Sequence, residues 1–373
     1  MKDRWLIAGL SVLGLAAMLS LMWQVRHRLA IGSNDFVSFY AGGRLAGTPD
    51  LYNPVRAAEV QKQLAGVTGE HWHYIRPPFH AAALWPLARL PYRVSYLLWQ
   101  GLCLAALAGF LILWRIPSLP LTLLYSSFFF PVFASFMNAQ DSTLILLWIA
   151  LAVDLERRGK SFAAGAALSL CAAKFHLFWP IPLLILAARK WRLGGGLLAG
   201  GGLLALVSFA VAGLGWPLDY YRALSGQGAI HPDVGHMPNL RGLFSLAPSQ
   251  AWLEWLWTAL AAAVVAFVAR RMSFRYALAV SLAAGVLGSH HAYIQDCSLL
   301  LPAGLILISE SRLTGLRAVT FLLLLPFPYL LLVFDSPLPA TVPAVILLLV
   351  ILAGVEAVYG HPAPARAEQQ RQP

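Results

Sequence analysis

Charged side chains are scarce in this chain. Asp, Glu, Lys and Arg make up 12% of its 373 residues, about half the roughly 25% found in soluble domains. Hydrophobic residues make up 59%, and apolar runs of about 20 residues recur along the whole length. This composition excludes a soluble globular protein. We expect an all-α polytopic membrane protein that forms one integral domain over residues 1–360.

Cysteine is also rare, and no Asp-x-Asp pair occurs. Three widely spaced cysteines argue against a disulfide framework or a metal cluster. We expect Cys103 and Cys171 to be buried packing residues, since both lie in apolar runs. A zinc site is the alternative use of the histidines, although their spacing matches no regular motif. Its ligands would be His71, His73 and His80. The sequence predicts no metal, no cofactor and no nucleic-acid partner.

Twelve apolar segments are candidate membrane spans, so we expect about 10 to 12 transmembrane helices with both termini in the cytoplasm. The segments are 5–23, 94–114, 117–136, 141–154, 162–173, 177–188, 193–213, 251–269, 276–288, 293–309, 316–334 and 338–358. This topology places 16 of the 27 Lys and Arg residues inside, mostly in short turns such as "ERRGK" (156–160). Contact of these turns with anionic lipids accounts for the net charge of +11.

Two longer polar stretches complete the expected layout. Residues 26–93 form a long outer loop with interfacial helices, in which the Pro-bounded stretch 77–91 is too short to span the membrane. The polar, Pro- and Ala-rich residues 361–373 should be a disordered cytoplasmic tail. The turn "KFH" (174–176) should lie at the tip of a helical hairpin, since one long helix would leave Lys174 in mid-membrane.

Chemistry-capable side chains gather on the expected outer side. Of the ten histidines, all but His361 are assigned there, although membrane insertion does not require this. Asp35 in "NDFVSFYAGGRL" (34–45) follows the first span and is flanked by Phe36 and Phe39. Partial desolvation would raise the pKa of this carboxyl toward working pH, as a general base requires. The alternative is a helix N-cap.

An ordered set of short motifs resembles glycosyltransferase family 87. The motifs are Asp35-Phe36, "LYNP" (51–54), Tyr74-x-x-Pro77-Pro78, Gln140, Lys174, "NLRGL" (239–243) and Ser289-His290-His291. Their order matches the family across about residues 30–300, although family members usually have Gly-Gln where this chain has Ala139-Gln140.

The resemblance implies a membrane mannosyltransferase of GT-C architecture at the cell membrane, with its active site on the extracytoplasmic face. Its donor would be a polyprenyl-phosphate sugar, commonly mannose, and its acceptor a glycolipid or glycan. Transfer would be a single displacement with inversion, with Asp35 as the base. The leaving group is already a phosphate, so the reaction does not require a metal.

Ten further residues are candidates for substrate contacts. Those expected to bind the donor phosphate are Lys174, His290, His291, Arg241 and Arg76. Those expected to bind the sugar or the acceptor are Tyr74, Gln140, Asp141, His176 and Asn239. Each has a structural alternative. Lys174 and Arg241 could be interfacial cations, the histidine pair could be one packed and one solvent-facing residue, "NAQD" (138–141) could cap a helix, and "YIRPP" (74–78) could be a rigid turn.

Two other classes of function fit the composition. A multi-pass transporter or flippase of lipid-linked or small polar substrates would have the same number of helices, but it would keep ionisable groups near the midplane and often show a repeat. No repeat is visible. A lipid-binding or assembly protein without catalysis would not need a carboxylate, a lysine and a histidine pair on one side.

Overall fold

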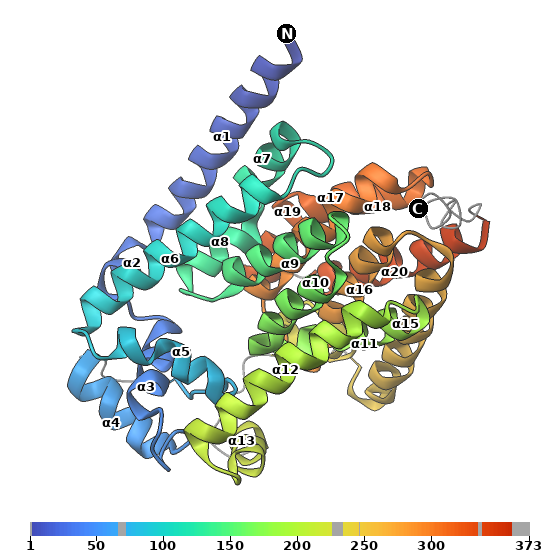
Figure 1. Ribbon diagram of the computed structural model, residues 1–373. Coiled ribbons are helices and arrows are strands. Elements are labelled where there is room, and N and C mark those ends of the chain that lie inside the picture. Colours follow the sequence, from blue (N-terminus) through green and yellow to red (C-terminus); the bar gives the residue numbers. More distant parts are fainter. Residues whose placement is uncertain (1, 66–71, 226–233, 246, 335–337, 360–373) are drawn as a thin grey trace.

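Helices account for all regular secondary structure in the part of the chain that is described. The computed structural model describes residues 2–65, 72–225, 234–245, 247–334 and 338–359, and within these ranges no strand occurs (Figure 1). The all-α class is therefore confirmed. The expected tail, 361–373, and His71 lie outside the described residues.

Five of the described helices are long and apolar enough to cross a membrane. They are α1 (Lys2–Gln24), α6 (Tyr92–Leu113), α12 (Trp191–Ala212), α15 (Trp252–Arg271) and α20 (Thr341–Tyr359). Two bent pairs pass the same test. They are α7 (Leu119–Phe128) with α8 (Phe130–Met137), bent by 58°, and α18 (Thr314–Leu324) with α19 (Phe327–Val333), bent by 52°. Prolines at the breaks, Pro131 and Pro326, explain the bends, because proline disrupts the preceding turn.

Five to seven described helices or helix pairs pass this test of length and composition, against ten to twelve expected spans, because the other apolar segments form helices too short to pass it. These are α9 (Ser142–Arg157), α10 (Ser161–Ser169), η1 (Leu170–Leu177), α11 (Pro180–Ala187), α16 (Phe274–Gly288), η4 (Ile294–Leu299) and α17 (Leu300–Glu310). Helix α16 shows the reason. It has 15 residues and is buried on all sides from Tyr276 to Leu287. A helix that is hydrophobic all round is enclosed by neighbouring helices or by lipid, and hydropathy alone does not separate the two.

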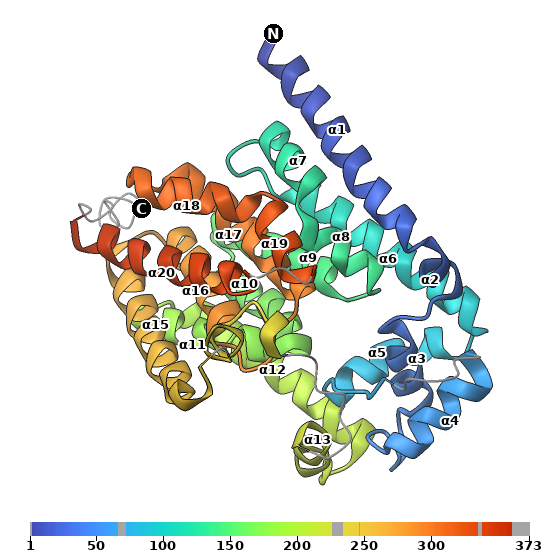
Figure 2. The same ribbon diagram turned by 180° about the vertical axis from the view of Figure 1, so that it is seen from behind.

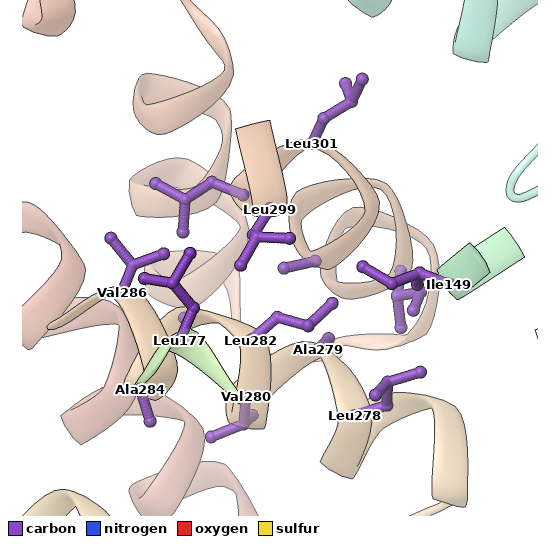
Figure 3. Close-up of a cluster of buried hydrophobic side chains, with 14 of the residues drawn as sticks. Ile149, Leu177, Leu278, Ala279, Val280, Leu282, Ala284, Val286, Leu299 and Leu301 are labelled. Atoms are coloured by element: carbon purple, nitrogen blue, oxygen red, sulfur yellow. The ribbon is translucent and has the colours of Figure 1, made fainter. Parts of the chain in front are cut away.

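The core forms around α16. Its side chains Leu278, Val280 and Leu282 pack in one cluster with residues of η1, η4, α9 and α17, including Leu177 and Leu299 (Figure 3). The three cysteines are buried, as expected for Cys103 and Cys171.

The chain reverses direction at "KFH" (174–176), as the hairpin prediction requires. Helices α10 and α12 run parallel. A Cβ at Gly196 would lie 1.9 Å from the Phe162 carbonyl oxygen, and one at Gly200 would lie 2.2 Å from Ser169 Oγ. Because α10 and α12 run the same way, α11 between them returns in the opposite direction. The glycines let the backbones of α10 and α12 touch, as is common between membrane helices.

The expected outer loop folds into short helices at the end of the molecule opposite the N-terminus (Figures 1 and 2). They are α2 (Arg26–Ile31), α3 (Phe36–Leu45), α4 (Pro54–Ala65) and α5 (Pro78–Ala88). Helix α13 (Trp216–Ser225) lies at the same end, and the short elements η2 (Val234–His236), α14 (Leu240–Phe244) and η3 (Pro248–Gln250) follow it. Stretch 77–91 is thus a short helix packed against α3 and α12, as its length predicted.

Candidate active site

A cavity of about 470 Å³ lies among the short helices and the breaks between the longer ones. This size is in the range of small-molecule sites. Its polar lining comes from six distant parts of the chain: Asp35 and Ser38; His73 and Arg76; Asn138 and Gln140; His176; His236; and His291, Tyr293, Gln295 and Asp296. Apolar side chains such as Phe39 and Leu332 line the remainder. Five of the candidates from the sequence, namely Asp35, Arg76, Gln140, His176 and His291, therefore meet in one cavity.

Asp35 lies at the start of α3, but its side chain does not cap the helix. Asn34 takes that place: its Oδ1 accepts from Phe36 N at 3.3 Å, and its Nδ2 donates to Tyr96 and to Met137 O. The Asp35 carboxylate is left to face the cavity. Asp35 thus occupies the N-cap position of α3 without a capping hydrogen bond from its side chain.

Close packing of α3 explains the paired glycines of "YAGGRL". A Cβ at Gly42 would lie 2.3 Å from the Tyr74 ring, and one at Gly43 would lie 2.7 Å from Ala88 Cβ of α5. Without these side chains, α3 approaches both the "YIRPP" segment and α5 closely enough to close one wall of the cavity.

Gln140 connects Asp35 to Arg76. Its Nε2 donates to Asp35 Oδ2 at 2.5 Å, while its Oε1 accepts from an Arg76 Nη2 at 2.9 Å. The preceding residue, Ala139, has φ of 50°, which L-residues adopt only with strain and glycine adopts freely. A glycine at this position would remove the strain. Trp99 donates to the Ala139 carbonyl at 2.8 Å and fixes the turn.

Four charged side chains form a buried cluster at the cavity wall. Arg76 and Asp296 also line the cavity, while Lys174 and Asp141 lie behind them. Lys174 Nζ lies 2.6 Å from Asp296 Oδ1, 3.3 Å from Asp141 Oδ1 and 3.0 Å from Ser142 Oγ. Arg76 approaches the same Asp141 oxygen at 3.5 Å. The two positive charges of Lys174 and Arg76 thus balance the two negative charges of Asp141 and Asp296. Lys174 is neither isolated nor snorkelling to an interface, because it is 2% exposed and does not line the cavity.

The cluster shifts the pKa values of its members in a consistent way. Burial alone would raise the pKa of Asp141, but Arg76, Lys174 and His80 together lower it below its ordinary value. The same holds for Asp296, whose pKa Lys174 and His176 lower against the effect of burial. Burial lowers the pKa of His80 to about 4, so its ring is neutral near pH 7.

Asp35 is shifted the other way. Burial raises its pKa, and the hydrogen bond from Gln140 and the charges of Arg76 and Lys174 offset this only in part. Nearby carboxyls with pKa values moved in opposite directions are a common sign of divided acid–base roles. Asp35 is the carboxyl suited to take up a proton.

Besides Lys174 and Asp141, four more candidates from the sequence lie outside the cavity lining, and each binds a partner within the protein. The Tyr74 hydroxyl is buried 3.2 Å from His80 Nδ1. Asn239 caps α14 by accepting from Gly242 N and donates to Ser289 O. Arg241 donates to the His290 carbonyl, and the His290 ring meets Glu254 Oε1 at 2.8 Å. Local hydrogen bonding accounts for these side chains, so the geometry does not favour the substrate contacts expected for them.

Sequence reasoning missed Asp296, which both lines the cavity and anchors Lys174. The signal was present, since an acid in "AYIQD" (292–296) is unusual in so apolar a chain. Its two oxygens are occupied by Lys174 and by the Tyr293 backbone N–H at 2.8 Å. His73 also lines the cavity, while no group of three or more His, Cys, Asp or Glu in the described ranges is placed to hold a metal ion.

The fold and the cavity define a polytopic membrane protein with a polar site. The family model of glycosyltransferase family 87 matches residues 72–293, more than half of the chain, and the chain therefore belongs to this family. It is a membrane glycosyltransferase of the GT-C class, and not the transporter or the non-catalytic lipid-binding protein weighed above. No curated protein and no solved structure matches. Asp35 precedes the matched stretch.

Proposed function

We propose that this glycosyltransferase transfers a hexose from a polyprenyl-phosphate donor to a lipid-linked or glycan acceptor, and that the hexose is mannose. The observation that supports this most strongly is the position of Asp35. Its carboxylate lines the cavity, and hydrogen bonds from the described residues reach only its Oδ2. Asp296 has both oxygens engaged, and Asp141 lies behind the wall. Asp35 is therefore the carboxylate available to an acceptor hydroxyl.

The reaction would be one inverting displacement. The acceptor oxygen attacks the anomeric carbon, its proton passes to Asp35, and the bond from that carbon to the phosphate oxygen breaks, so that polyprenyl phosphate leaves with the electron pair. Gln140 orients Asp35 for this transfer.

Arg76 would stabilise the departing phosphate, because among the described lining residues it alone carries a fixed positive charge. Burial lowers the pKa of His176 to about 3 and lowers that of His291. Both are therefore neutral near pH 7 and would donate hydrogen bonds to the sugar or the phosphate without adding charge. Lys174 would act from behind the wall by holding Asp296.

Activity should fall as the pH drops through the pKa of Asp35. The base works only when deprotonated, and burial raises this pKa, so half-maximal kcat/KM should come at a pH above the ordinary carboxyl value of about 3.9. The measurement is kcat/KM against pH with a synthetic polyprenyl-phosphate mannose donor. The residual activity of Asp35→Asn should lack this acid limb. An unchanged limb in that variant would assign it to another group, such as a histidine.

The proposed orientation places the cavity outside and the basic turns inside. In intact cells, a membrane-impermeant maleimide should label Val55→Cys on exposed α4 and should not label Lys160→Cys until the membrane is opened. Both positions are exposed, and the three native cysteines are buried, so the parent protein provides the background. Labelling of residue 160 with residue 55 protected would reverse the orientation.

A further inference from the structure

Helix α13 begins where a membrane-spanning helix ends. Helix α12 is long and apolar enough to cross the bilayer and stops at Ala212. Gly213, with φ of 75°, breaks the helix, and Leu214 after it is 87% exposed. Helix α13 follows at Trp216, directly after the end of α12 (Figure 1).

The inner face of α13 packs on the protein through aromatic rings. Trp216 and Tyr220 are one helical turn apart and therefore share a face. The Trp216 ring lies 5.8 Å from that of Phe209, and the Tyr220 ring lies 5.5 Å from that of Tyr52. Contacts within the chain therefore account for the aromatic residues on this face.

A second face of α13 is apolar and exposed. Leu218, Tyr221 and Leu224 recur at three-residue spacing and form one stripe. Their exposed fractions are 53%, 65% and 44%. The third face is polar, where Asp219 and Arg222 pair at 3.3 Å. At 100° per residue, the apolar stripe and the ion pair lie on opposite sides of the aromatic face.

We propose that α13 lies in the plane of the membrane surface, with its apolar stripe among the lipid chains and its ion pair toward water. The partner is the phospholipid headgroup and acyl boundary, which takes helices of this three-sided pattern. The continuity with α12 argues for lipid and against a soluble protein partner, since the stripe starts where the spanning helix emerges. The proposal goes beyond the proposed function and does not depend on it.

The same helix supports the wall of the cavity. The Tyr220 hydroxyl donates to the Ile75 carbonyl at 3.5 Å, and its ring lies 6.3 Å from that of Phe175. Ile75 and its neighbour Arg76 line the cavity, as does His176, which follows Phe175. Lipid contact by α13 would therefore hold the wall that bears Arg76 and His176 at headgroup depth.

The test places single cysteines on the two exposed faces. Leu218→Cys and Tyr221→Cys report on the apolar stripe, and Asp219→Cys and Arg222→Cys are the matched controls on the same helix. Each is labelled with an environment-sensitive fluorophore in vesicles of phosphatidylcholine and phosphatidylglycerol. Emission should be blue-shifted at 218 and 221 relative to 219 and 222, and lipids carrying a nitroxide near the headgroup should quench it more strongly there.

Two outcomes would overturn the proposal. Equal, water-like emission at all four positions would mean that α13 stands clear of the lipid. Equal, lipid-like emission would mean that it is immersed in the bilayer. All four side chains are exposed, so the substitutions leave the core intact. A second readout is the rate of modification by a water-soluble thiol reagent, which should be slower at 221 than at 219, since these positions lie on opposite sides of the helix. Neither readout requires sugar transfer, so failure here is distinct from failure of the proposed reaction.

Discussion

Asp35→Asn should lower sugar transfer by at least about a hundredfold, because general-base catalysis contributes roughly 10²–10⁴-fold. Asparagine keeps the size and polarity of the side chain but cannot accept the proton of the acceptor. The helix start should survive, since Asn34 and not Asp35 bonds to the Phe36 N–H. The measurement is kcat of the purified variant with a polyprenyl-phosphate mannose donor, together with donor affinity, which should stay close to that of the parent.

Asp50→Asn is the matched control. It makes the same chemical change in the same outer segment, at a side chain that pairs with Arg56 and Asn53 near the surface. Activity of this control should stay within a few-fold of the parent. If Asp35→Asn also stayed within a few-fold, Asp35 would not be the base. If it lost expression while Asp50→Asn did not, Asp35 would have a role in folding.

Lys174→Met should destabilise the protein by roughly 3–5 kcal/mol, because removal of one partner leaves uncompensated charge in a buried ion-pair cluster. Asp141 and Asp296 would then face Arg76 alone. Loss of thermal stability in detergent should therefore accompany any loss of activity. This expectation differs from the donor-binding role predicted for Lys174 from the sequence, since the structure places Lys174 behind the cavity wall.

A second substitution makes the test specific. Lys174→Met with Asp296→Asn restores the balance of charge, so the double variant should be more stable than Lys174→Met alone. Lys160→Met, at an exposed turn, is the matched control and should melt with the parent. If Lys174→Met kept the stability of the parent and lost only donor affinity, Lys174 would bind the donor phosphate, as predicted from the sequence.

Sequence reasoning was most effective where a residue type was out of place. Polar groups in so apolar a chain are rare enough that their shared side could be predicted, and Asp35, Arg76 and Gln140 do meet in one cavity. It failed where an outcome depended on distant partners. Lys174 and Asp296 are 122 residues apart, and no local pattern predicts that they pair.

The surroundings of each apolar helix were hidden for a related reason. Helices packed among other helices and helices that face lipid have the same hydropathy, so the burial of α16 could not be predicted before its neighbours α15, α17 and α20 were placed. The local hydrogen bonds of single polar side chains could not be predicted from the sequence either. Asn239 resembles a substrate ligand in the sequence, yet its polar atoms serve the α14 turn and Ser289.

The close backbone contact between α10 and α12 fixes how far each helix extends relative to the other along their common axis. The two helices touch at Gly196 and Gly200, and they are linked again beyond their ends, where Phe175 meets Tyr220. Two such attachments along a parallel pair oppose sliding and rotation, so His176 should keep a constant position relative to the end of α12. The phosphate of the proposed polyprenyl donor would also have a set height, since its tail would be anchored among the lipid chains. Protein and substrate would thus be aligned vertically before they meet, which leaves only a search in the plane of the membrane.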